Sequence, residues 1–125
     1  MPAASIAKIE NVRRSGLESL SILRDAGVTM AYGTDLLGPT HIRQSEEFAI
    51  RARVLPARDI LASATTIGAK LVGMEGRLGT LAPGAIADLL VVQGNPLDDI
   101  TLLADPGKNL FLVMKDGVIR HRREI

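Results

Sequence analysis

Residues 28–35 read VTMAYGTD, a short apolar run that ends in a lone aspartate. The run is rich in β-branched and aromatic side chains, and Gly27 separates it from the helical pattern before it, so residues 28–34 are predicted to form a strand. A carboxylate at the C-terminal end of a buried strand lies where α/β barrels place their chemistry. Asp35 is therefore the first candidate catalytic residue, with a turn-forming carboxylate as the alternative interpretation.

A polar loop, residues 36–48, follows the predicted strand and carries His41. This histidine could line a substrate pocket or reach a metal, and simple solvation is the alternative. Ser45 is predicted to cap a helix, because Glu46 and Glu47 suit its positive N-terminal end. Capping and helix-start solvation explain Gln44 and Glu47 as well as substrate contact does, so we assign neither a role.

Length and composition restrict the class of protein. The chain has 125 residues, of which 46% are hydrophobic, enough for a real core, but a complete (β/α)₈ barrel needs about 250 residues. A net charge of +1 and 2% aromatics predict no nucleic-acid or anionic-membrane partner. There is no cysteine for a disulfide or thiolate site. No stretch has the length and hydropathy of a membrane span or signal peptide, so a cytoplasmic protein is predicted.

The helical predictions rest on capping and periodicity. Ser15 and Glu18 have capping-box spacing, so a helix is predicted to start at Ser15 and to end at Gly27. A third helix is predicted to open near Pro56 and to close at Gly73. Its predicted buried face consists of Ile60, Ala64, Ile67 and Leu71.

From Gly76 onward the pattern favours β-structure. Strands are predicted over residues 78–81, 87–92, 110–114 and 118–121, with a loop containing a helical turn over 96–109. Residues 82–84, Ala-Pro-Gly, predict a type II turn, and Asp116-Gly117 predicts a type I′ hairpin. The basic residues 120–123 are interpreted as a solvated final strand. The order is helix, strand, two helices and then an antiparallel sheet, an α/β arrangement.

Several motifs in a fixed order resemble the C-terminal part of the metal-dependent amidohydrolases. They are YGTDLLG at 32–38, His41 with QSEEF at 44–48, ATT at 64–66, and GTLAPGAIADL at 79–89. A later segment, VMKDG at 113–117, is similar to the closing hairpin of those enzymes. The resemblance is to the imidazolonepropionase-related and Xaa-Pro dipeptidase-like branch, and it covers nearly the whole chain from Ser15.

The resemblance implies a fold. Enzymes of this family combine a (β/α)₈ barrel with a β-sandwich built from both chain ends. By this analogy residues 1–75 are the C-terminal part of the barrel, with 28–34 as its last strand followed by helices. Residues 76–125 are then a small antiparallel sheet that forms half of the sandwich.

The resemblance also implies a site. Asp35 matches the aspartate that ligates a divalent metal, usually zinc, and accepts the proton of the attacking water. His41 is a candidate for substrate contact. The family's other ligands, a His-x-His pair, a carboxylated lysine and two histidines, come earlier in the chain, whereas this sequence has only His41 and His121. We therefore expect the chain to be inactive and metal-free alone, and the intact enzyme to act on a small amide or dipeptide-like substrate.

Two alternatives remain open for the function. The chain could be a truncated, non-enzymatic module that oligomerises or binds a partner. It could also be one half of a split enzyme whose other chain supplies the missing N-terminal barrel portion. A barrel strand without neighbours exposes two edges, so self-association is expected in either case.

Overall fold

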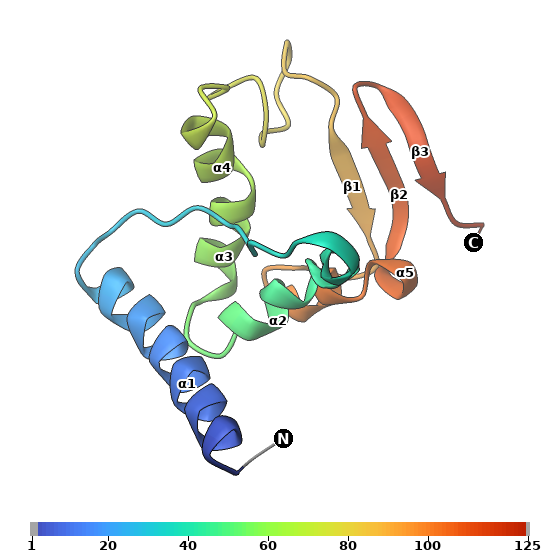
Figure 1. Cartoon of the computed structure of the whole chain (residues 1–125). Helices are drawn as coiled ribbons and strands as arrows, with labels where there is room; N and C mark the ends of the chain where they lie inside the picture. The colour runs from blue at the N-terminus through green and yellow to red at the C-terminus, as the bar shows by residue number, and fades with distance from the viewer. Residues whose placement is uncertain (1–2, 125) are drawn as a thin grey trace.

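The first helix is longer than predicted. The computed structural model describes residues 3–124, and its helix α1 spans Ala3–Asp25 and projects from the rest of the chain (Figure 1). The predicted start at Ser15 is wrong, because Ser15 lies inside the helix and its carbonyl accepts a hydrogen bond from the Ser19 hydroxyl at 2.8 Å. The preceding residues include good helix formers such as Lys8 and Glu10, and their summed propensity outweighs one capping pattern.

The end of α1 is as predicted. Gly27 has a φ of 71°, and the Val28 N–H donates to the Leu23 carbonyl at 2.9 Å, which closes the helix with a left-handed glycine. This cap directs the chain into the extended segment that follows.

Residues 28–37, here called the extended segment, do not form the predicted strand. They run as extended coil across the molecule, and no strand pairs with them in the part of the chain that the structure describes (Figure 1). Within residues 3–124, residues 28–36 have one backbone hydrogen bond to a later element, from the Tyr32 N–H to the Ser63 carbonyl at 3.0 Å, and the Leu37 carbonyl accepts from the Thr40 N–H of η1 at 3.3 Å. A strand needs a neighbouring backbone as well as strand-like side chains, and residues 3–124 supply no such neighbour.

Four short helices follow the extended segment. The second of them begins directly after Ser45 with Glu46 and Glu47 in its first turn, as predicted, although the Ser45 side chain makes no capping hydrogen bond. Their bounds are Gly38–Arg43 for the 3₁₀-helix η1, Glu46–Arg51 for α2, Ala57–Ala64 for α3 and Thr66–Leu71 for α4.

The predicted third helix is broken in two at Thr65. This residue has φ −121° and ψ −95°, and its hydroxyl donates to the Leu61 carbonyl at 2.7 Å. The predicted buried face is correspondingly only partly right, since Ile60 is fully buried whereas Leu71 is 74% exposed. Gly73, with a φ of 70°, closes α4 as predicted.

A three-stranded antiparallel sheet forms the other side of the molecule (Figure 1). Its strands are β1 (Leu89–Val92), β2 (Leu110–Lys115) and β3 (Val118–Arg122), in the order β1-β2-β3. The predicted strand at 78–81 is absent, and residues 78–80 form a bend instead. The hairpin is confirmed, because Asp116 and Gly117 have φ of 51° and 74°, as a type I′ turn requires.

The remaining turns and the core link the two sides. The type II turn is confirmed by the Ala85 N–H, which donates to the Ala82 carbonyl at 3.1 Å, with Gly84 at φ 87°. Two helical turns, η2 (Ile100–Ala104) and α5 (Pro106–Asn109), connect β1 to β2. The core contains residues from both sides, namely Leu55, Ile60, Ile100, Leu103 and Leu110.

No helix within residues 3–124 is long and apolar enough to cross a membrane.

Candidate active site

The extended segment is held by a cluster of side chains around Tyr32. The Tyr32 ring lies 4.6 Å from the Phe48 ring, centroid to centroid, at an interplanar angle of 31°. The Arg51 guanidinium lies 5.2 Å from the Tyr32 centroid, and the Tyr32 hydroxyl donates to the Gln44 carbonyl at 2.8 Å. Helix α2 therefore fixes the segment that leads to Asp35. We call these residues, Tyr32, Glu47, Phe48 and Arg51, the Tyr32 cluster.

A buried ion pair forms the polar part of this cluster. Arg51 Nε donates to Glu47 Oε1 at 2.7 Å, and the two side chains are only 7% and 19% exposed. Arg51 Nη1 also donates to the Ala31 carbonyl at 3.3 Å. The pKa of Tyr32 is raised to about 12, first by burial and then by the negative charge of Glu47, and Arg51 opposes the shift. The Tyr32 hydroxyl thus stays protonated and keeps its hydrogen bond at neutral pH.

Asp35 follows this cluster at the point where the chain turns. It has a φ of 53°, in the left-handed region that aspartate tolerates better than most residues. Its side chain is exposed, and no hydrogen bond or ion pair to it is present among residues 3–124. The carboxylate is therefore available to a group that the described residues do not supply.

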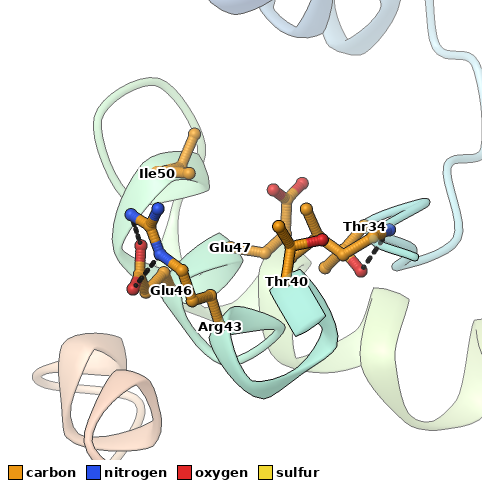
Figure 2. A pocket seen from close by; sticks show the side chains of 7 residues that line it. Thr34, Thr40, Arg43, Glu46, Glu47 and Ile50 are labelled. Atoms are coloured by element: carbon orange, nitrogen blue, oxygen red, sulfur yellow. Dashed lines mark hydrogen bonds and ion pairs between the residues drawn. The ribbon is translucent and has the colours of Figure 1, made fainter. Parts of the chain in front are cut away.

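A cavity of about 330 Å³ lies beside Asp35, between the extended segment and α2. Figure 2 shows the ion pair of Arg43 and Glu46 on one side, Thr34 on the other, and Glu47 between them. Arg43 bonds both carboxylate oxygens of Glu46, at 2.8 and 2.7 Å, which lowers the pKa of Glu46. The lining residues are Thr34, Leu36, Thr40, Arg43, Glu46, Glu47 and Ile50.

The structure places the two predicted site residues next to this cavity but not in its lining. Asp35 lies between the lining residues Thr34 and Leu36, and His41 directly follows Thr40 on the exposed face of η1. Within the described range, no three histidine, cysteine, aspartate or glutamate side chains converge on a point where a metal could bind. The candidate site in the described residues therefore consists of the Asp35 carboxylate with a polar cavity beside it.

Sequence reasoning missed the Tyr32 cluster. Glu47 was assigned no role and Arg51 was not singled out, although their four-residue spacing on a helix permits an ion pair. That spacing is equally typical of solvated surface pairs. The burial of Arg51 depends on the extended segment packing against α2, a contact between residues twenty positions apart.

Comparisons with known proteins show the family of this chain. The sequence model of the Amidohydrolase family matches residues 2–120. The chain therefore belongs to the amidohydrolase family. The family is generally metal-dependent. The small α/β structure with its three-stranded antiparallel sheet matches solved structures of the family.

Three relatives illustrate the range of the family. The crystal structure of a prolidase complexed with N-methylphosphonate-L-proline superposes with a TM-score of 0.85 at 50% identity, over 98% of this chain and 30% of that one. A Xaa-Pro dipeptidase with bound methionine in its active site gives 0.75 at 34% identity, over 83% of this chain and 25% of that one. The 5-methylthioadenosine/S-adenosylhomocysteine deaminase of Syntrophobacter fumaroxidans is 30% identical, over 86% of this chain and 27% of its own length. The chain thus spans between a quarter and a third of the length of these relatives.

Proposed function

We propose that these 125 residues are the C-terminal part of a metal-dependent amidohydrolase that hydrolyses amide or peptide-like C–N bonds. Asp35 is the observation that carries this proposal. Its carboxylate is exposed, is engaged by no partner in residues 3–124, and lies at the end of a segment fixed by a buried cluster. A carboxylate in such a position is available to ligate a metal.

The chemistry of Asp35 fits one ligand position of a divalent metal, and zinc is the metal we propose. Zinc accepts carboxylate oxygen, but a catalytic zinc site usually has three protein ligands. Residues 3–124 offer no group of three, so we propose that the other ligands come from sequence outside these 125 residues. The bound metal would supply Lewis acidity and would lower the pKa of water.

We assign Asp35 a second role as the proton acceptor. A carboxylate within hydrogen-bond reach of the attacking water can take its proton and pass it to the leaving amine, which is general base and then general acid catalysis. His41 is proposed as a substrate contact because it adjoins Thr40 at the edge of the cavity.

A dipeptide-like substrate is the class that we favour. The solved relative described as a prolidase shares 50% identity with this chain, against 30% to 36% for the deaminases. The cavity beside Asp35 combines one cationic and two anionic side chains with threonine hydroxyls. A lining of this kind suits a small polar ligand.

The proposal assigns the two parts of the chain to two parts of the family fold. Residues 1–75 would complete a barrel, and residues 76–125 would form half of a sandwich. In this arrangement the extended segment, with its strand-like side chains, would pair with a neighbouring strand supplied by the rest of the enzyme. The backbone of residues 29 and 30, which makes no hydrogen bond within residues 3–124, supports this assignment.

The experiment supplies the missing portion as a separate chain, taken from the prolidase relative upstream of its matching segment. We expect the reconstituted pair to retain zinc after desalting and to cleave an Xaa-Pro dipeptide, and the 125-residue chain alone to do neither. Asp35→Asn should abolish the cleavage and most of the zinc binding. Asp116→Asn is the matched control, because Asp116 has nearly the same φ, 51° against 53°, but lies in the β2–β3 turn.

Two results would contradict the proposal: zinc retention and cleavage unchanged by Asp35→Asn, or equal losses in both variants. Cleavage by the reconstituted pair would support the split-enzyme alternative as well, and a genomic neighbour encoding the N-terminal portion would then distinguish a split enzyme from a truncated one.

The alternative of a non-enzymatic module rests on exposed apolar surface. Ile6, Ile9 and Val12 on α1 are each more than half exposed, and Leu90 and Val91 on the edge strand β1 are 51% and 45% exposed. Surfaces of this kind favour self-association or binding of a partner. We propose that the isolated chain self-associates at micromolar concentration, and a monodisperse monomer by light scattering would contradict this.

A further inference from the structure

Arg51 is the one buried charged residue in the part of the chain that the structure describes. Its guanidinium has three partners, which lie on two elements. It donates to Glu47 at 2.7 Å on its own helix, to the Ala31 carbonyl at 3.3 Å, and it lies over the Tyr32 ring. Two of the three partners therefore belong to the extended segment, three and four residues before Asp35.

The extended segment depends on these contacts to an unusual degree. A strand inside a sheet is held by a ladder of backbone hydrogen bonds, whereas residues 28–36 have one backbone bond to a later element within residues 3–124, from Tyr32 to Ser63. The guanidinium adds a charge-assisted hydrogen bond and a cation–π contact to adjacent residues. Because a buried guanidinium must keep its partners, the contacts are held in one geometry.

We propose that Arg51 is a positioning residue for Asp35. It fixes the backbone at Ala31 and Tyr32, and through them the direction in which the Asp35 carboxylate leaves the segment. Glu47 serves the same purpose by orienting the guanidinium. The proposal rests on the proposed role of Asp35 in catalysis, but the order that Arg51 imposes on residue 35 is a property of this chain alone.

Lysine cannot fully replace arginine in this position. A guanidinium is planar, so it can donate in two directions and stack on a ring at the same time, whereas an ammonium on a flexible stem cannot hold all three contacts. Arg51→Lys is therefore expected to rescue part of the effect of an apolar replacement.

The test measures mobility at position 35 in the full chain. The sequence has no cysteine, so Asp35→Cys creates a unique attachment site for a nitroxide label, and its mobility is read by electron paramagnetic resonance. In the Arg51→Met background we expect the rotational correlation time at position 35 to shorten about threefold, in line with release of an ordered segment. Arg51→Lys should give an intermediate value.

Two controls separate positioning from general stability. A label at Lys70→Cys, on α4, should show the same mobility with and without Arg51→Met. Arg58→Met removes an arginine whose side chain is 87% exposed and should change neither label. If Arg51→Met does not fold, by far-ultraviolet circular dichroism, Arg51→Lys and Glu47→Gln provide the same test with smaller shifts in the same direction.

Unchanged mobility at position 35 in the Arg51 and Glu47 variants would overturn the proposal. Equal loosening at positions 35 and 70 would also overturn it, because Arg51 would then be a general stabiliser. The measurement needs neither metal nor activity, so its outcome is independent of whether the proposed hydrolysis is confirmed.

Discussion

The β2–β3 hairpin and the extended segment satisfy their backbones in opposite ways. In the hairpin the ladder between β2 and β3 carries the structure, and every residue of β3 (Val118–Arg122) is exposed. In the extended segment no ladder is present among the described residues, and the side chains of Tyr32 and Arg51 provide the hold instead. Where backbone hydrogen bonds hold a segment, its side chains can be exposed to solvent. Where those hydrogen bonds are lacking, contacts of buried side chains must hold the segment in their place.

The difference has a consequence for the candidate active site. A residue at the end of a hydrogen-bonded strand inherits its position from the sheet. The position of Asp35 is set by α2 through the Tyr32 cluster, and α2 also lines the cavity. Because Glu47 belongs both to the cavity lining and to the Tyr32 cluster, we expect a ligand in the cavity to affect the orientation of Asp35.

The largest expected effect tests whether the two regions share one core. Ile60 is fully buried and packs with Ile100 and Leu110 from the sheet side. Ile60→Ala should lower the free energy of unfolding by about 3 kcal/mol, the usual cost of such a cavity, measured by urea unfolding. Leu71→Ala, at a side chain that is 74% exposed, should change it by less than about 0.5 kcal/mol. Similar decreases in the free energy of unfolding for Ile60→Ala and Leu71→Ala would mean that Ile60 does not lie in a core shared by the helices and the sheet.

A smaller effect is expected at the contact between the α3–α4 break and the loop before the sheet. A Cβ on Gly79 would lie 2.4 Å from the Thr65 carbonyl carbon and oxygen, and Gly79 has a φ of 67°. Gly79→Ala should cost about 2 kcal/mol, because left-handed strain and displaced backbone add together.

Gly76→Ala is its matched control. Gly76 has a φ of 74° with nothing within 4 Å of the added Cβ, so only the conformational cost of about 1 kcal/mol remains. Equal losses at the two glycines, measured by thermal unfolding, would show that Thr65 moves freely.

The hairpin should respond to acid through Asp88. Its carboxylate accepts hydrogen bonds from Lys115 Nζ at 2.5 Å and from the Asp116 N–H at 2.7 Å, which lowers the pKa of Asp88 below its usual value. A lowered folded pKa contributes stability above the unfolded value of about 3.9, and this contribution is lost as the pH falls through the folded pKa.

The melting temperature of the wild-type chain should therefore fall more steeply below about pH 4 than that of Asp88→Asn. Glu75→Gln, a surface carboxylate for which the structure shows no partner in residues 3–124, serves as the control. If the melting temperature depends on pH in the same way in all three proteins, Asp88 does not stabilise the contact between the hairpin and the loop before β1.

The smallest expected change in stability concerns α1. Ile9 and Val12 are 53% and 65% exposed, so Ile9→Glu combined with Val12→Lys keeps the net charge and should alter the free energy of unfolding by less than about 0.5 kcal/mol. The same pair of substitutions should reduce self-association, measured by light scattering across a concentration series. Undiminished association would locate the contact elsewhere, with the β1 edge as the next candidate.

Short-range chemistry made part of this fold predictable. The type I′ turn at Asp116-Gly117, the type II turn around Gly84, and the glycine caps at Gly27 and Gly73 all follow from residues that favour positive φ. Each of these features is decided within four to six residues. The strands on either side of the hairpin were predicted for the same reason, since their partners are adjacent in the chain.

The wrong predictions fall where the deciding contacts are distant or lacking. The strand at 28–34 requires a neighbouring strand, and the break at Thr65 accompanies the close approach of Gly79, fourteen residues later. Asp35 was identified from its motif, and its role stays a prediction. The buried state of Arg51 could not be predicted, because surface and buried i,i+4 ion pairs have the same spacing.

Tyr32 makes the extended segment optically visible. It is the only tyrosine of a chain that has no tryptophan, so the near-ultraviolet signal of the protein comes almost entirely from one ring in contact with Arg51. The folded phenol ionises near pH 12, whereas a released one ionises near its ordinary value of about 10. Between these values phenolate absorbance counts the molecules in which the segment has come loose, without any label.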